Sequence, residues 1–160
     1  MDAARVNAVV SNASPLIAFR QLGQIDLLHA LTGPLLIPTA VHREVFHDWQ
    51  PPTWIEVRVL GSQTQPILLK PRLGAGESEA IALALELGGA KILLDDLAAR
   101  RTAEGYGLEV AGTLGLLYQA RQRSLIPALK PALDALLHFN FRISPSLYRM
   151  LLESAGESES

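Results

Sequence analysis

Two adjacent carboxylates, Asp95 and Asp96, directly follow a short apolar run at 90–94. Such a run is typical of a buried parallel strand, so both acids would lie at the carboxyl end of that strand. Ligands and catalytic groups gather at this edge of open α/β sheets. Unit charges about 4 Å apart repel by roughly 4 kcal/mol at an effective dielectric near 20. A bound cation or a neighbouring base would relieve this repulsion.

Polar side chains recur at corresponding places of the other expected elements. Asn12 follows the first expected strand, Glu44 lies one turn into a helix after the second, and Glu77 opens the helix before the Asp95 strand. Because parallel strands end at a common edge, we expect these side chains to converge. Hard oxygen ligands suit Mg²⁺ or Mn²⁺. Such an ion can activate water and neutralise a phosphodiester in the transition state.

The elements that must position these residues are short strands alternating with helices. Strands are expected at 6–10, 35–37, 54–60, 90–94 and 108–110, the third of them half-exposed or at an edge. Ser14 followed by Pro15 is expected to cap the first helix. The alternation predicts the α/β class, a three-layer α/β/α fold with a central, mainly parallel sheet. We expect one domain, 1–152, and a disordered acidic tail, 153–160.

Composition narrows the class of protein. The 160 residues are 49% hydrophobic and 19% charged, which is typical of a compact globular chain. A net charge of −2 gives no global attraction for nucleic acid, so a nucleic-acid substrate would need a local basic patch or a metal. The absence of cysteine excludes disulfides and thiolate sites and fits a cytoplasmic location. No signal peptide or membrane span is expected.

Four segments, taken in order, resemble a PIN domain, and in particular the PIN-like DUF3368 group related to VapC-type toxins. They are 9–17, 37–45, 76–84 and 94–96. The residue pair at 99–100 and the run at 112–117 are also typical of that group. The likeness covers about 9–152.

The resemblance implies a metal-dependent endoribonuclease that hydrolyses RNA phosphodiester bonds, the toxin of a toxin–antitoxin pair. By the same likeness Asn12, Glu44, Glu77 and Asp95 stand at the catalytic positions, and Mg²⁺ or Mn²⁺ would be held by Glu44, Glu77, Asp95 and Asp96. Most active PIN nucleases carry Asp where Asn12 stands. Because Asn adds no negative charge, we expect weaker metal binding and slow or lost cleavage.

Supporting roles and alternatives complete the prediction. Ser14 and Arg100 would support the site, and the expected partners are RNA, an antitoxin protein and a second copy of the chain. Asp96 is equally well explained as a helix cap, and Glu79 competes with Glu77 as the ligand on its helix. The alternative function is a catalytically weak or inactive PIN-like module that binds RNA or protein.

Overall fold

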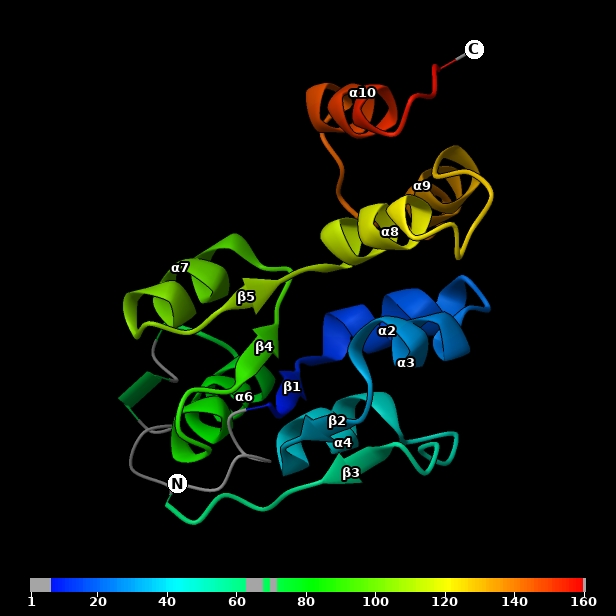
Figure 1. The fold of residues 1–160 in the computed structure, drawn as a ribbon. Coiled ribbons are helices and arrows are strands. Elements are labelled where there is room, and N and C mark those ends of the chain that lie inside the picture. The colour runs from blue at the N-terminus through cyan, green and yellow to red at the C-terminus, as the bar shows by residue number, and fades with distance from the viewer. Residues whose placement is uncertain (1–6, 63–67, 70–71, 160) are drawn as a thin grey trace.

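A computed structural model describes residues 7–62, 68–69 and 72–159 (Figure 1). Within them five strands form one sheet, in the order β3-β2-β1-β4-β5, and every pairing is parallel. The strands are β1 (Val9–Ser11), β2 (Leu35–Ile37), β3 (Ile55–Val57), β4 (Lys91–Leu93) and β5 (Val110–Ala111). Val9 is in register with both Leu35 and Lys91, which places β1 at the centre of the sheet.

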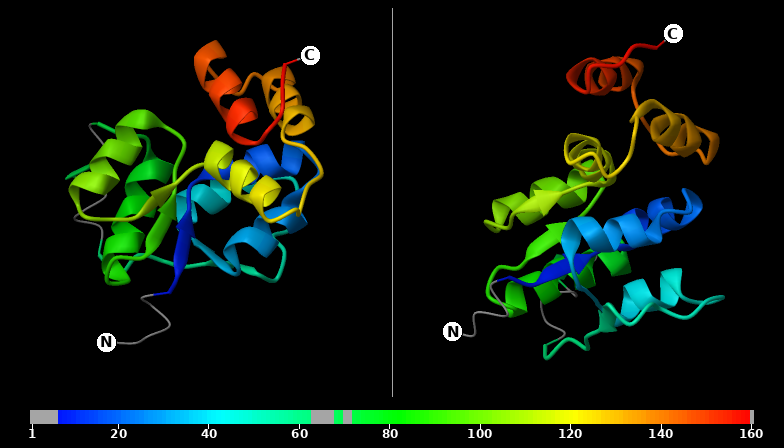
Figure 2. Two further views of the ribbon diagram at one scale, coloured as in Figure 1. Left: turned by 45° about the horizontal axis from the view of Figure 1, so that its top comes forward. Right: turned by 45° about the vertical axis from the view of Figure 1, so that its right-hand side comes forward.

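Eight helices are present in the same described residues. They are α2 (Ala13–Gln21), α3 (Ile25–Thr32), α4 (Thr39–Val45), α6 (Ala75–Glu86), α7 (Leu97–Gly105), α8 (Thr113–Gln122), α9 (Lys130–His138) and α10 (Pro145–Ser154). α2, α3, α8 and α9 contribute to the core on one face of the sheet, whereas α6 and α7 cover the other face (Figures 1 and 2). The three-layer α/β/α fold predicted from the sequence is therefore confirmed.

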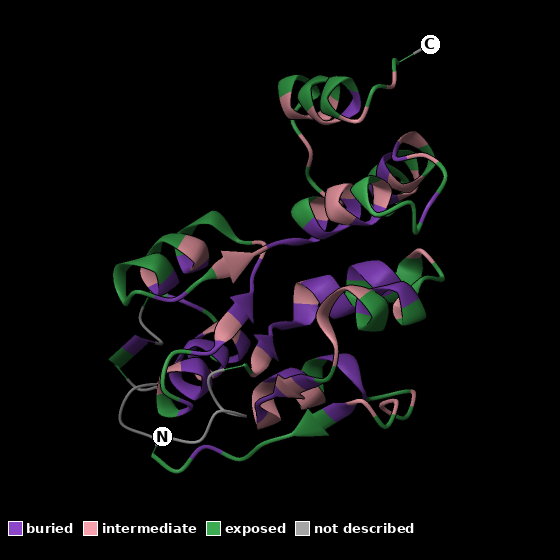
Figure 3. Cartoon of the chain, viewed as in Figure 1, coloured by how far each residue is buried: buried purple, intermediate pink, exposed green. Residues whose placement is uncertain are grey.

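Alternation along the central strands explains why the sheet is buried on both faces. Ile92 and Leu94 pack with α6 and α7, whereas Leu93 between them packs with α2 and α8. All three are fully buried, as expected where successive strand residues point to opposite faces. Figure 3 shows buried residues concentrated in the central strands, α2 and α6, and mainly exposed residues in α10.

The first helix begins earlier than the sequence predicts. Its N-cap is Asn12, so Ser14 lies inside the first turn and Pro15 follows it. Pro15 is tolerated there because the first turn of a helix has no backbone acceptors for its N–H groups. The expected cap at Ser14 is therefore wrong, and the Ser14 hydroxyl is available for another partner.

The C-terminal segment also differs from the expected disorder after residue 152. Helix α10 continues to Ser154, and the Glu157 carboxylate accepts hydrogen bonds from the backbone N–H groups of Leu129 (2.7 Å) and Lys130 (3.0 Å). It also pairs with Arg121 at 3.3 Å. Burial alone would raise the pKa of Glu157, but the two amides and Arg121 hold it below its usual value. The acidic residue orders this segment because it occupies the positive N-terminus of α9.

The described part of the chain contains no helix that is both long enough and apolar enough to span a membrane.

Candidate active site at the carboxyl edge of the sheet

The candidate site lies where the strand order reverses. The chain builds β1, β2 and β3 outward in one direction and then returns to place β4 on the other side of β1. Ligands bind outside the carboxyl ends of strands at such a switch point. Asn12 follows β1, and its backbone N–H donates to the Leu93 carbonyl at 3.0 Å, while Asp95 emerges two residues beyond β4.

Three of the predicted catalytic residues line one pocket, which we call the acid pocket. It has a volume of about 420 Å³ and is lined by Asn12, Ser14, Glu44 and Glu77, with Gly74–Gly76 at the start of α6. A β-carbon on Gly76 would lie 3.2 Å from Asn12 Oδ1 and 3.7 Å from Glu44 Oε1. Both oxygens therefore approach one point, and they lie no more than about 7 Å apart. A side chain at position 76 would intrude between them.

The Asn12 side chain has a buried oxygen that lacks a partner. Asn12 is only 6% exposed, and its Oδ1 accepts no hydrogen bond from the residues that the structure describes. A buried polar atom without a partner costs roughly 1–3 kcal/mol of stability. An amide oxygen is also a suitable ligand for a hard cation. A ligand bound there would recover this stability cost.

The pKa of Glu77 is raised above its usual value. Burial is the largest cause, and the negative charges of Asp96 and Glu44 add to it. The Gly74 N–H, which donates to Glu77 Oε1 at 3.3 Å, acts in the opposite direction. Glu77 thus lies within the field of two other acids, and a cation placed among them would favour its ionised form.

The Asp95 carboxylate, unlike the acids that line the pocket, is occupied by several hydrogen bonds within the protein. Its Oδ2 accepts hydrogen bonds from Ser14 Oγ (2.6 Å) and Thr113 Oγ1 (2.7 Å), and its Oδ1 accepts from the Thr113 backbone N–H (2.7 Å). A carboxylate has about four acceptor sites, so three of them are used. Asp95 therefore joins the acid pocket through Ser14 and leaves little room for a further ligand.

Thr113 is a site residue that the sequence interpretation missed. It is fully buried and opens α8 directly after β5, with Gly112 as the helix N-cap. The available signal was its place after a parallel strand, where a backbone N–H at a helix start meets an anion. A β-carbon on Gly112 would fall on an Arg100 guanidinium nitrogen and lie 3.0 Å from Asp95 Oδ1, so a larger residue there would displace Arg100 and crowd Asp95.

Arg100 does not line the acid pocket. Its Nη1 donates to the Leu94 carbonyl at 2.9 Å, and with Asp95 it lines a second pocket of about 530 Å³. We call this the basic pocket, because Arg142 also lines it. Phe141 lines both pockets.

Two acids whose roles were left open have structural partners. Asp96 Oδ2 accepts a hydrogen bond from the Ala99 N–H at 3.0 Å, so Asp96 caps α7. Glu79 Oε1 accepts one from the Ala40 N–H at 3.1 Å, at the start of α4. Glu79 thus fastens the helix that carries Glu44, whereas Glu77 faces the pocket.

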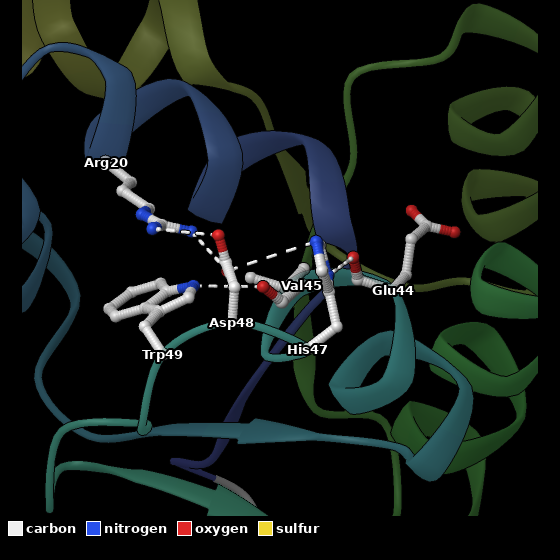
Figure 4. A network of polar contacts seen from close by, with 6 residues as sticks. All are labelled: Arg20, Glu44, Val45, His47, Asp48 and Trp49. Atoms are coloured by element: carbon white, nitrogen blue, oxygen red, sulfur yellow. Dashed lines mark hydrogen bonds and ion pairs between the residues drawn. The ribbon is translucent and has the colours of Figure 1, made fainter.

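The far end of α4 is fastened by a second network, shown in Figure 4. Arg20 of α2 pairs with Asp48 at 3.0 Å and lies over the Trp49 ring, 4.5 Å from its centroid. The Trp49 indole donates to the Val45 carbonyl at 2.9 Å. Figure 4 shows the Glu44 carboxylate pointing away from this network. α4 is therefore held at both ends, which fixes Glu44 relative to Asn12 at the start of α2.

The predicted set of four carboxylate ligands does not assemble into one cluster. Across 7–62, 68–69 and 72–159, no three His, Cys, Asp or Glu side chains are arranged to hold a metal ion. The pocket instead offers two carboxylates, Glu44 and Glu77, and the unpartnered Asn12 oxygen. This donor set fits Mg²⁺ chemistry, because Mg²⁺ uses one or two carboxylates and keeps several waters.

Comparison with known proteins gives one finding. A family model, DUF3368, described as a PIN domain, matches residues 8–157. No curated protein and no solved structure gives a significant match to the chain.

Proposed function

The chain belongs to the DUF3368 family of PIN domains, which are generally nucleases, and from this premise we propose that it is a metal-dependent endoribonuclease. The observation that carries the proposal is the acid pocket at the switch point of the sheet. There Asn12, whose buried oxygen has no partner among the described residues, lines the same pocket as two carboxylates, at the edge where α/β enzymes place their chemistry.

Asn12 Oδ1, Glu44 and Glu77 would hold Mg²⁺ or Mn²⁺. PIN domain nucleases typically use divalent metals. When bound, the ion would supply an activated water and neutralise the phosphodiester. Asp96 contributes its negative charge, which already acts on Glu77. With Asn12 in place of an acid, the set carries one negative charge fewer, so weak affinity is expected.

Asp95 and Ser14 would act as positioning residues around this set. The Ser14 hydroxyl donates a hydrogen bond to Asp95, so the lone pairs of Oγ remain for the pocket that Ser14 lines. Glu44 and Glu77 would accept hydrogen bonds from the attacking water and orient it toward phosphorus. Arg100, held on the Leu94 carbonyl beside Asp95, would meet a phosphate of the substrate.

In its biological setting the proposed enzyme is the toxin of a toxin–antitoxin pair. Its partners would be an RNA substrate, an antitoxin protein and a second copy of the chain, all in the cytoplasm. This part of the proposal rests on the likeness to VapC-type toxins.

A second candidate function is a PIN-like module that binds RNA or protein without cleaving. Two observations favour it: the missing charge at Asn12, and the lack of a three-acid metal cluster within the described residues.

Cleavage of a labelled single-stranded RNA by the purified chain, with Mn²⁺ or Mg²⁺ against EDTA, tests the proposal. Glu44→Gln should abolish cleavage that requires metal. Glu79→Gln is the matched control, because its amide oxygen can still accept the Ala40 N–H bond. If the native chain never cleaves and Asn12→Asp creates activity, the native protein is the binding module instead.

A further inference from the structure

The linker between α9 and α10 brings aromatic and basic side chains to the candidate site. Phe139 and Phe141 line the acid pocket, although they are 127 and 129 positions beyond Asn12 in the chain. Phe141 and Arg142 line the basic pocket together with Arg100. The linker therefore runs past both pockets in turn.

A helix-terminating motif fixes the linker backbone. Asn140 adopts a left-handed conformation with φ of 66°, and its N–H donates to the Leu137 carbonyl at 3.0 Å. The Phe141 N–H donates to the Leu136 carbonyl at 2.9 Å. These two bonds form a Schellman motif, in which Asn is one of the few residues that tolerate the left-handed position. The backbone of the linker is therefore held in place before any ligand arrives.

The two phenylalanines differ in exposure. Phe141 packs against the core cluster that contains Leu136 and is only partly exposed. Phe139 is 43% exposed, and its ring meets that of His138 edge to face, with centroids 5.5 Å apart. An aromatic ring left open to solvent beside a polar pocket is typical of a surface on which a planar group stacks.

Arg142 supplies a free positive charge on the same linker. It is exposed, and the described part of the chain provides it with no ion pair or side-chain hydrogen bond. With Arg100 it lines a pocket that adjoins the acids through Phe141. Aromatic rings flanked by arginines are the pattern that binds single-stranded nucleic acid, with bases on the rings and phosphates on the cations.

We propose that this linker selects single-stranded RNA: Phe139 stacks an unpaired base, and Arg142 with Arg100 contacts the phosphates that follow. The inference rests on the proposed ribonuclease function for the choice of RNA. A duplex would be rejected because its paired bases cannot reach Phe139, and sequence-tolerant contact with RNA uses splayed, unstacked bases.

Binding of fluorescein-labelled single-stranded RNA, followed by anisotropy in EDTA and in Ca²⁺, tests this without cleavage. Phe139→Ala should weaken binding about 5- to 150-fold, the loss that follows removal of one stacked base. Phe139→Trp should retain binding, whereas Phe139→Leu should not. Leu137→Ala is the matched control, because Leu137 is 41% exposed on the same helix end but lines neither pocket.

The salt dependence of RNA binding tests the proposed phosphate contact separately. Arg142→Gln should reduce the slope of log affinity against log salt by about 0.7, the value for one phosphate of a single strand. Arg149→Gln, on the exposed surface of α10 away from both pockets, should leave the slope unchanged. A 2-aminopurine base in the bound RNA should lose fluorescence with the native chain and not with Phe139→Ala.

The outcomes separate this inference from the proposed function. If the chain cleaves with Mn²⁺ but Phe139→Ala binds like Leu137→Ala, the linker inference fails and the nuclease proposal stands. If no variant cleaves but binding depends on Phe139, the nuclease proposal fails and the linker inference stands. Equal affinity for duplex, no binding of single strands in either buffer, or a Phe139→Ala effect only on self-association would each overturn the inference.

Discussion

Replacing Asn12 by Asp should convert the acid pocket into a site that depends on metal for its stability. Asn12 is 6% exposed, and its unpartnered Oδ1 lies no more than about 7 Å from Glu44 Oε1. The substitution replaces the amide with a negatively charged carboxylate of almost the same size. The shape of the side chain is therefore preserved, and only the electrostatics change. Without a cation the folded state should lose stability.

The loss can be estimated from this separation. Unit charges about 7 Å apart repel by roughly 1–2 kcal/mol for effective dielectrics between 40 and 20, which suits one exposed and one buried group. A change of 1 kcal/mol moves Tm by about 2–4 °C for a domain of this size. In EDTA, Asn12→Asp should therefore unfold about 2–8 °C below the native chain.

Divalent metal should reverse the order of stability. An ion that binds only the folded state stabilises it by about 2.7 kcal/mol at 100 times its Kd. Each tenfold gain in affinity from the added charge contributes a further ~1.4 kcal/mol at saturation. Differential scanning fluorimetry across a Mn²⁺ titration should show a larger rise in Tm for Asn12→Asp than for the native chain, and metal-dependent RNA cleavage should rise with it.

Asn7→Asp provides the matched control, since Asn7 is exposed and precedes β1, at the opposite end of the strand that leads to Asn12. It adds the same charge to the molecule, so its Tm should hardly change with or without Mn²⁺. If Asn12→Asp were as stable as the native chain in EDTA and gained nothing from Mn²⁺, the acid pocket would not be a cation site.

Three further substitutions, one of them with a matched control, test the arrangement around the pocket. Gly112→Ala should lower the free energy of unfolding in urea by about 1–3 kcal/mol, because the new methyl group overlaps Arg100 and crowds Asp95. Gly115→Ala, in open space on α8, should instead raise it by about 0.5–1 kcal/mol, and equal effects would contradict the packing. Thr113→Val should cost about 1.5–3 kcal/mol through loss of its hydrogen bond to a charged group, and a neutral result would exclude that bond. The folded state raises the pKa of Glu77 above its usual 4.5, so the native chain binds more protons when it is folded than when it is unfolded. Its stability therefore falls as the pH rises through the raised pKa of the folded state. In EDTA, the Tm of Glu77→Gln relative to the native chain should therefore be higher near pH 7 than near pH 4, and a constant difference would refute the raised pKa.

Most of the fold could be predicted because its signals are local. Short apolar runs alternating with helix patterns predicted the parallel sheet. Because parallel strands end at one edge, Asn12, Glu44 and Glu77 could be expected to lie together, and all three line the acid pocket. Errors arose where a residue has two local explanations. Ser14 before a proline resembles a cap, but the N-cap position is occupied by Asn12, whose side chain makes no capping hydrogen bond within the described residues.

The roles of the individual acids were decided by tertiary structure. Asp95 and Asp96 are equivalent in sequence, yet Asp96 caps its own helix, whereas Asp95 is taken up by Ser14 and Thr113. Ser14 and Asp95 are 81 positions apart, and no local pattern encodes their contact.

The position of the linker that carries Phe139, beside the acid pocket, was likewise decided by tertiary structure. Its backbone conformation follows from a local cap at Asn140, but its position depends on how α9 packs against the core. The sequence by itself thus determined the elements and the edge at which the polar residues gather. The tertiary structure decided which oxygens remain free for a ligand and which are used by the protein, because hydrogen-bond partners are chosen by packing between distant segments.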